Sequence, residues 1–234
     1  MKSFLSSIKF LTIIPAPGKE VGKNTVAFFP AAGIFLGAII YILNFFLKKI
    51  FPQTITNAFI LLVYTILTGG LHLDGLADTF DAISGSKGDR KKFFEILDDS
   101  RIGTSGTIAL IFSIMLKFLL LTEKSLLIFP VVSRWSIVFS MFISKPAKED
   151  GLGSLFIRNT NFGMFLFSTI FSVAIASLFL HWKGVIALFL VTSIVASIIV
   201  VFFTKKIGGI TGDILGAINE ISEILCLILL KIIS

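Results

Sequence analysis

Seven long apolar segments limit this chain to one kind of fold. Residues 26–47, 159–180 and 184–204 carry no charged side chain, and about 20 apolar residues are enough for a helix to cross the hydrocarbon core of a bilayer. Four further segments are apolar with few interruptions: 51–71, 102–122, 125–144 and 211–233. The alternation typical of barrel strands is absent from them. The sequence therefore predicts an all-α polytopic membrane bundle of about seven transmembrane helices, folded as a single domain over residues 1–234.

The composition agrees with a membrane protein. Charged residues make up 15% of the chain and hydrophobic residues 55%, whereas about 25% of the residues of an average soluble domain are charged. The first 14 residues place Lys2 and Lys9 among apolar side chains, just before Pro15. No small-residue cleavage site follows them, so we expect a short helix at the membrane interface rather than a signal peptide.

The net charge of +7 is spread over loops between the apolar segments, without a basic face of the kind that binds nucleic acid. With the N-terminus inside, fourteen lysine and arginine residues fall in inner loops and five in outer loops or at the C-terminal end. Inner loops of membrane proteins carry such an excess of positive charge. We therefore expect an integral cytoplasmic (inner) membrane protein whose longest polar insertion, residues 72–101, faces the cytoplasm. Its partners are then the lipid bilayer and small molecules, and a homo-oligomer is compatible with the sequence.

Three aspartates stand in this insertion, directly after an apolar segment. Asp74, Asp78 and Asp81 are spaced i, i+4 and i+7, which places them on one stripe of a helix. Like charges so close repel each other unless a cation lies between them. Mg²⁺ binds carboxylate oxygens, usually together with a substrate phosphate. The alternative is a solvated polar face at a helix end, but acidic clusters at a membrane are costly and usually functional, so we favour an active site.

The rest of the insertion predicts a second short helix. The run Ser-Gly-Ser-Lys-Gly at residues 84–88 breaks the insertion, and residues 89–99 follow as a helix that ends at Asp99, close to Arg101. The small and hydroxyl residues of 100–106 then begin the next apolar segment. Their backbone N–H groups suit a phosphate or an ordinary helix cap, and both interpretations stay open.

Acidic residues also occur in the last apolar segment. Asp213, Glu220 and Glu223 lie within about 80° of one another on a helical wheel, so we expect them to face the interior of the bundle. Arg134, within the apolar segment 125–144, suits two roles: a counter-charge that fixes packing or a ligand for phosphate. His72 is expected to cap its helix or to support the aspartates.

Residues 69–81 read Gly-Gly-Leu-His-Leu-Asp-Gly-Leu-Ala-Asp-Thr-Phe-Asp, and this run resembles the signature of the cobalamin synthase family, the adenosylcobinamide-GDP ribazoletransferases. Further stretches match in the expected order and extend the resemblance over almost the whole chain: residues 29–33, 99–104, 133–134, 151–153 and 208–217, with Glu220 and Glu223. Ala82 departs from the family, which often has glycine after the third aspartate.

The resemblance implies a reaction late in vitamin B12 biosynthesis. The cobinamide phosphate half of adenosylcobinamide-GDP is joined to the ribose 3′-hydroxyl of α-ribazole or its 5′-phosphate, and GMP is released. Asp74, Asp78 and Asp81 would bind Mg²⁺, and one of them or Asp99 would act as general base. Arg101 and Arg134 would contact the diphosphate or the GMP leaving group. The corrinoid or ribazole pocket would be lined by Asp213, Glu220 and Glu223.

Three other classes compete with this interpretation. A CDP-alcohol phosphatidyltransferase also sets aspartates at helical spacing, but its motif has Ala-Arg where this chain has Ala77-Asp78. A prenyltransferase would need two similar aspartate-rich motifs. A transporter would use the intramembrane acids and Arg134 as an ion pathway, yet the inverted repeats usual in transporters are not evident in the sequence.

Overall fold

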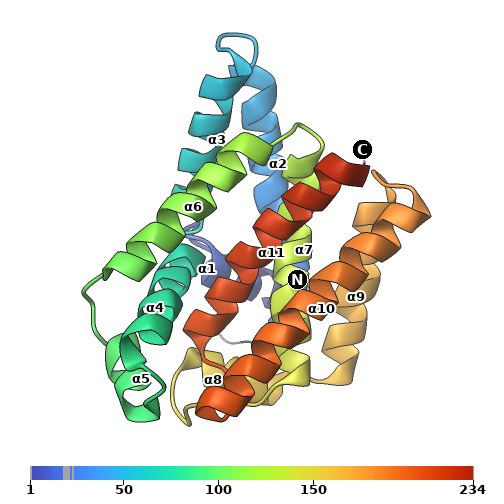
Figure 1. Ribbon diagram of the computed structural model, residues 1–234. Helices are drawn as coiled ribbons and strands as arrows, with labels where there is room; N and C mark the ends of the chain where they lie inside the picture. The colour runs from blue at the N-terminus through green and yellow to red at the C-terminus, as the bar shows by residue number, and fades with distance from the viewer. Residues whose placement is uncertain (1, 18–21, 23, 234) are drawn as a thin grey trace.

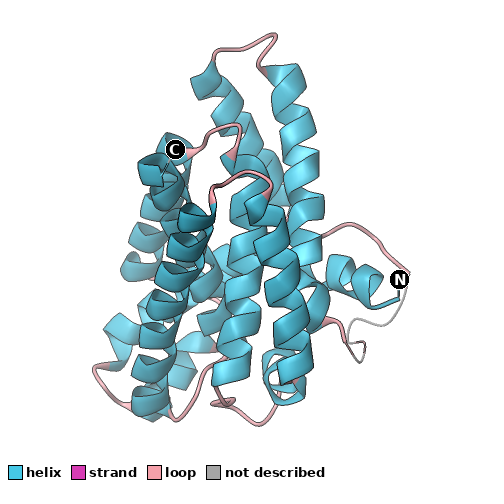
Figure 2. Ribbon diagram, turned by 90° about the vertical axis from the view of Figure 1, so that its right-hand side faces the viewer, coloured by secondary structure: helices cyan, strands magenta, loops and turns pink. Residues whose placement is uncertain are grey.

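The computed structural model describes residues 2–17, 22 and 24–233; Lys19 and Lys23, two of the expected inner-loop lysines, lie outside them. The described residues form helix and loop (Figures 1 and 2), with one isolated bridge between Pro146 and Ile210. The all-α prediction is confirmed. The elements are α1 (Lys2–Leu11), the 3₁₀ turn η1 (Val26–Phe28), α2 (Phe29–Leu47), α3 (Gln53–Leu67), α4 (Leu71–Ser86), α5 (Arg90–Leu97), α6 (Thr104–Leu120), α7 (Ser125–Ile143), α8 (Leu152–Asn159), α9 (Phe162–Ser177), α10 (Trp182–Ile207) and α11 (Gly212–Ile233).

Each of the seven expected segments contains a helix, but fewer of these helices qualify as spans by length and composition. Within the described residues three do so: Val26–Leu47, α7 and α10. Two bent pairs, α3 with α4 at 86° and α8 with α9 at 92°, raise the number to five at most. Helix α6 is apolar but shorter, and α11 carries four charged side chains. The number of seven crossings therefore stays a prediction.

Helix α7 lies at the centre of the bundle and packs against α2, α9, α10 and α11. Its contact with α2 depends on small residues, because a Cβ atom added to Gly37 would lie 2.8 Å from the carbonyl oxygen of Leu126. Close approach of backbones through small residues is the usual packing of membrane helices. Helices α2 and α7 therefore form a closely packed pair, and α7 also contacts α9, α10 and α11.

Two glycines bend the chain between α3 and α4. Gly69 and Gly70 have φ angles of 61° and 69°, a left-handed conformation that glycine adopts without a steric penalty. The bend redirects α4, which, with α5 and α8, we treat as lying outside the membrane-spanning segments, as predicted from the sequence. The predicted break of the polar insertion is confirmed, since α4 ends at Ser86 and α5 begins at Arg90.

Helix α4 packs directly on the start of α11, again through glycine. A Cβ atom on Gly75 would lie 2.7 Å from the carbonyl oxygen of Asp213, and one on Gly216 would lie 3.2 Å from that of His72. Helix α8 approaches the same point, because a Cβ atom on Gly153 would lie 2.8 Å from the backbone nitrogen of Gly212. Three segments that are far apart in the sequence therefore meet at the beginning of α11.

Two other short elements complete the fold. Helix α1 is the short helix expected at the N-terminus, and it lies against the side of the bundle (Figure 2) with Ile8 and Leu11 buried. Helix α8 was not expected, since residues 145–161 read as a loop. Its apolar residues Phe156 and Ile157 are buried, and this burial stabilises a helix too short to be recognised from its pattern.

Candidate active site

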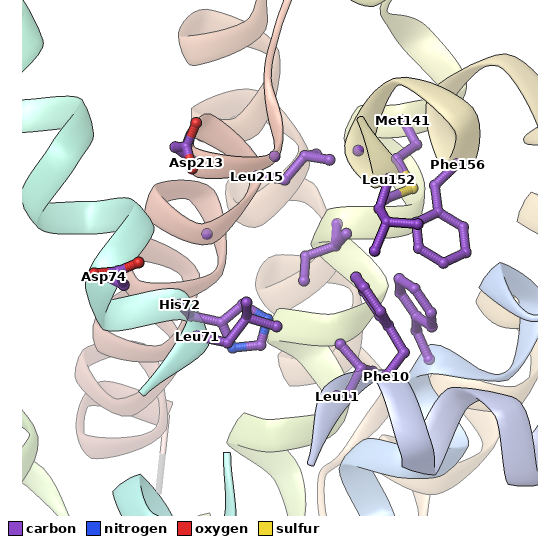
Figure 3. A pocket seen from close by; sticks show the side chains of 15 residues that line it. Phe10, Leu11, Leu71, His72, Asp74, Met141, Leu152, Phe156, Asp213 and Leu215 are labelled. Atoms are coloured by element: carbon purple, nitrogen blue, oxygen red, sulfur yellow. The ribbon is translucent and has the colours of Figure 1, made fainter. Parts of the chain in front are cut away.

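The contact between α4 and α11 brings together acids that are far apart in the sequence. Asp74, in the first turn of α4, and Asp213, in the first turn of α11, border the same cavity. Figure 3 shows both carboxylates on one side of this cavity, opposite a group of apolar side chains. Asp213 also accepts a 3.1 Å hydrogen bond from the hydroxyl of Thr211. The sequence predicts Asp74 as a metal ligand and Asp213 as a residue of the substrate pocket, whereas in the structure both border one cavity.

Asp78 lies one turn beyond Asp74 and is half-buried. Its partial burial, together with the negative charges of Asp74, Asp213 and Asp81, raises the pKa of its carboxyl group to about 6. Burial disfavours the charged form of the carboxyl group, and the neighbouring negative charges disfavour it further. Asp74 and Asp78 thus lie on one face of helix α4, as their i, i+4 spacing predicts, and Asp213 of α11 lies near this face.

Asp81 has a different environment from the other two aspartates of α4. Its Oδ2 accepts a 2.7 Å hydrogen bond from the backbone N–H of Gly103, and its Oδ1 accepts a 2.8 Å bond from that of Gly106. A Cβ atom on Gly103 would lie 2.5 Å from Asp81 Oδ1, so both glycines leave room for the carboxylate. The start of α6 is thus capped by an acid from α4, which supports the cap interpretation of residues 100–106.

Asp99 and Arg101 pair with each other in the loop between α5 and α6. The Arg101 backbone N–H, Nε and Nη2 donate bonds of 3.1, 3.0 and 2.6 Å to the Asp99 carboxylate. These bonds lower the pKa of the Asp99 carboxyl group to about 2. Arg101 is exposed, so its guanidinium is accessible at the start of α6.

The cavity beside Asp74 and Asp213 has a volume of about 220 Å³. Nine large apolar side chains, three glycines and three polar residues line it; the polar residues are His72, Asp74 and Asp213. Three phenylalanines pack together at its wall: the ring centroids of Phe10 and Phe156 are 4.6 Å apart, and those of Phe29 and Phe156 are 5.7 Å apart. We call this space the aromatic cavity.

His72 lines the aromatic cavity rather than capping α4. It is 5% exposed, and no hydrogen bond to its ring is found among the described residues. Burial, followed by the nearby positive charges of Arg134 and Lys117, lowers the pKa of the imidazole to about 3. His72 is thus a neutral side chain that borders an apolar space.

Glu220 and Glu223 lie apart from the cavity, in a buried polar network between α6, α7 and α11. Lys117 Nζ lies 2.6 Å from Glu220 Oε2 and 2.7 Å from Glu223 Oε2. Arg134 Nη1 lies 2.5 Å from Glu223 Oε1 and also donates to the hydroxyl of Tyr64. Of the three acids of α11, only Asp213 lines the aromatic cavity.

The contacts of Arg134 support its role as a counter-charge. The side chain is fully buried, and the predicted contact with phosphate stays untested. Lys117 and Tyr64 were not among the predicted site residues. Lys117 was nevertheless conspicuous as the one charged residue in segment 102–122, and a lysine in such a segment indicates a buried acidic partner.

The described residues contain no group of three or more histidine, cysteine, aspartate or glutamate side chains arranged as a preformed metal site. Asp81, one of the three predicted metal ligands, accepts hydrogen bonds from the backbone N–H groups of Gly103 and Gly106. The predicted Mg²⁺ site therefore stays a prediction, and any ion held here would depend on fewer protein ligands.

Comparisons with known proteins agree over nearly the full chain. A family model described as cobalamin-5-phosphate synthase matches residues 3–231. An adenosylcobinamide-GDP ribazoletransferase from Clostridium tetani is 40% identical over 233 residues, covering 94% of this chain and 92% of the relative. Relatives of the same name from Caldanaerobacter subterraneus and Acetivibrio thermocellus are 37% and 39% identical, covering 100% and 98% of this chain and 99% and 97% of the relatives. No solved structure matches the chain.

Proposed function

The chain belongs to the cobalamin-5-phosphate synthase family and is a membrane transferase of cobalamin biosynthesis, and we propose a specific reaction for it. The ribose hydroxyl of α-ribazole or α-ribazole 5′-phosphate attacks the phosphorus of the cobinamide phosphate in adenosylcobinamide-GDP. The phosphoanhydride bond to GMP breaks, a new phosphodiester forms, and the hydroxyl proton passes to a carboxylate. The observation that carries this proposal is the meeting of Asp74, Asp78 and Asp213 beside the aromatic cavity.

The donor atoms at this point suit Mg²⁺ bound together with a diphosphate. Mg²⁺ is usually held by one or two carboxylates and by substrate phosphates rather than by a complete protein cage, so the absence of a three-ligand group among the described residues is compatible with it. Asp74 and Asp78 are the proposed ligands, and Asp213 is the nearest further acid. Asp81 accepts one hydrogen bond at each oxygen from Gly103 and Gly106 and keeps a further lone pair on each oxygen. When bound, Mg²⁺ would neutralise the diphosphate and the leaving GMP.

The protein's own side chains supply position and proton transfer. Asp213, on the side of the cavity opposite the phenylalanines, is placed to accept the proton of an attacking hydroxyl. Arg101 is exposed and held by Asp99 through Nε and Nη2, so its remaining N–H donors are placed to contact phosphate oxygens. Because its carboxylate accepts hydrogen bonds from Arg101, Asp99 is better suited to position Arg101 than to act as a general base.

We propose that this site faces the cytoplasm and that the membrane is the cytoplasmic (inner) one. Helices α5 and α8 and the turn between α10 and α11 lie at the same, lower end of the bundle in Figure 1. Together with the flanking residues Lys87, Arg101, Lys145, Lys148, Lys205 and Lys206, these segments hold ten of the fourteen basic residues predicted for inner loops. Nucleotide substrates are found on that side.

The experiment is an assay of GMP release by detergent-purified protein with Mg²⁺, adenosylcobinamide-GDP and α-ribazole 5′-phosphate. We expect GMP and the joined corrinoid to form in equal amounts. Omission of the α-ribazole 5′-phosphate, or removal of Mg²⁺ with a chelator, should abolish the release. A folded protein that forms CMP from a CDP-alcohol instead would place the chain in the competing class of phosphatidyltransferases.

A further inference from the structure

The loop between α7 and α8 is fixed to the chain just before α11. The backbone N–H of Ala147 donates a 2.9 Å hydrogen bond to the carbonyl oxygen of Ile210, and the N–H of Ile210 donates a 3.0 Å bond to the carbonyl oxygen of Lys145. A short way beyond this contact in the two segments, Gly153 and Asp213 line the aromatic cavity. The loop therefore has a defined position beside the proposed substrate site.

Lys148 lies in this loop and is held at both its backbone and its side chain. Its carbonyl oxygen accepts a 2.7 Å hydrogen bond from the hydroxyl of Ser154, a buried residue in the first turn of α8. Its ammonium group lies 2.6 Å from Oδ1 of Asp98 and 5.2 Å from the ring centroid of Phe94. The Lys148 side chain is 32% exposed, so a ligand in solution can reach the ammonium group.

Lys148 and Arg101 are paired with consecutive acids of the loop between α5 and α6. Asp98 pairs with Lys148, and Asp99 pairs with Arg101. The positive charge of Lys148 also acts on the carboxylate of Asp213 at the start of α11. Two cations from different parts of the chain are thus brought to one loop, and one of them is close to the acids of the proposed site.

The proposed site requires positive charge at this place. Asp74, Asp78 and Asp213 already concentrate negative charge, and the diphosphate of the donor adds more. One bound Mg²⁺ ion would neutralise only part of it. A lysine ammonium group binds phosphate oxygens through charge-assisted hydrogen bonds. The ion pair that now occupies Lys148 is exposed, and exposed pairs contribute little to stability, so a phosphate can replace Asp98 at small cost.

We propose, on the basis of the proposed function, that Lys148 is a further substrate-binding residue, whose ammonium group leaves Asp98 and binds the diphosphate of the donor. Arg101 contacts the same diphosphate from the neighbouring loop. The fixed backbone of Lys148 limits the positions that its ammonium group can reach, and these lie beside Asp213. Asp98 serves only as the partner of Lys148 when the substrate is absent.

The test compares Lys148→Gln with Asp98→Asn in the full-length chain, because both variants break the same ion pair. Lys148→Gln is expected to raise KM for adenosylcobinamide-GDP about tenfold or more, as expected for loss of a hydrogen bond to a charged group. Asp98→Asn should leave this KM unchanged, and neither variant should change KM for α-ribazole 5′-phosphate. Lys91→Gln removes another exposed lysine that is paired with an acid, Glu95, and controls for a general loss of positive charge.

Two results would overturn the proposal. Equal changes of KM in Lys148→Gln and Asp98→Asn, including no change in either, would limit Lys148 to its ion pair. A higher KM for α-ribazole 5′-phosphate alone would show that Lys148 contacts the phosphate of the acceptor instead. Lys148→Arg keeps the positive charge and should retain part of the affinity for the donor. If Lys148→Gln does not fold, Lys148→Ala replaces it with the same expectation.

Binding of inorganic pyrophosphate with Mg²⁺, measured without either substrate, separates this proposal from the proposed function. Wild type, Asp98→Asn and Lys91→Gln should bind pyrophosphate equally, and Lys148→Gln should bind it about tenfold more weakly. This pattern, in a protein whose wild type releases no GMP, would support the phosphate contact and reject the transfer reaction. GMP release by a wild type that binds pyrophosphate no better than Lys148→Gln would retain the reaction and reject the contact.

Discussion

The ammonium group of Lys117 lies 2.7 Å from the Glu223 carboxylate at a position where both side chains are almost completely buried. This ion pair joins α6 to α11, and Arg134 joins the same carboxylate to α7. A buried charge that loses its partner is far more unfavourable than the intact pair is favourable. The network therefore joins three helices at the middle of α11, two turns beyond Asp213.

Lys117→Met is accordingly expected to destabilise the protein by about 3–5 kcal/mol, because it leaves two buried carboxylates with one cation. The measurement is the thermal unfolding temperature in detergent. Lys124→Met, at an exposed lysine four residues beyond α6, serves as the control and should have little effect. The double variant Lys117→Met/Glu220→Gln should recover part of the loss, and equal stability of the single variant and the control would contradict this role.

Arg134→Lys separates the two roles considered for this residue. The Arg134 contacts with Glu223 and Tyr64 predict a lower unfolding temperature, since an ammonium group cannot reproduce the guanidinium geometry. The folded fraction should keep its KM for adenosylcobinamide-GDP. A variant with unchanged unfolding temperature but no GMP release would show instead that Arg134 contacts phosphate.

Asp74→Asn is expected to lower kcat/KM for GMP release by at least about a hundredfold, because loss of one charged group that stabilises a transition state costs about 3 kcal/mol or more. Asp74 is exposed, so the unfolding temperature should change little. Asp98→Asn is a matched control, since Asp98 is also exposed and its one ion pair is with Lys148. Normal activity of Asp74→Asn with Mg²⁺ would remove Asp74 from the proposed metal site.

Gly106→Ala tests the cap on α6. The added methyl group would press on the Asp81 carboxylate and lie 2.8 Å from the carbonyl oxygen of Ala77, so we expect a loss of about 1–3 kcal/mol from overpacking. The control is Gly163→Ala near the start of α9, where the nearest atom to a new Cβ is a side-chain oxygen at 3.3 Å. Equal unfolding temperatures for the two variants would argue against a tight contact between α4 and α6.

The raised pKa of Asp78 predicts a dependence of stability on pH. Its value of about 6 in the folded protein is above the ordinary value of 3.8, so the folded state binds the proton more tightly than the unfolded state. In the presence of a chelator, stability should therefore fall as the pH rises from about 4 to about 6. Asp78→Asn should remove this part of the profile, and Mg²⁺ should raise the unfolding temperature of wild type at pH 7 more than at pH 5. An identical profile for Asp78→Asn would contradict the assignment.

The helices and half of the acidic site could be predicted from the sequence. Apolar segments define α2, α7 and α10, and the spacing of Asp74 and Asp78 fixes a shared face because helical geometry is local. The partner of Asp81 could not be predicted, because its bonds go to the backbone of Gly103, which a side-chain pattern does not reveal. The pairing of Lys117 with Glu220, more than one hundred residues away in the sequence, depends on the packing of whole helices.

The glycine contact between α4 and α11 also has a consequence for biosynthesis. Asp74 and Asp78 are synthesised well before Asp213, Gly216 and Leu215, which belong to α11. A nascent chain therefore has an exposed acidic stripe and no complete substrate site until α11 inserts beside α4. The proposed substrate site is therefore completed only when α11 packs against α4, the same step that buries Ile214, Leu215 and Ile218 in the hydrophobic core.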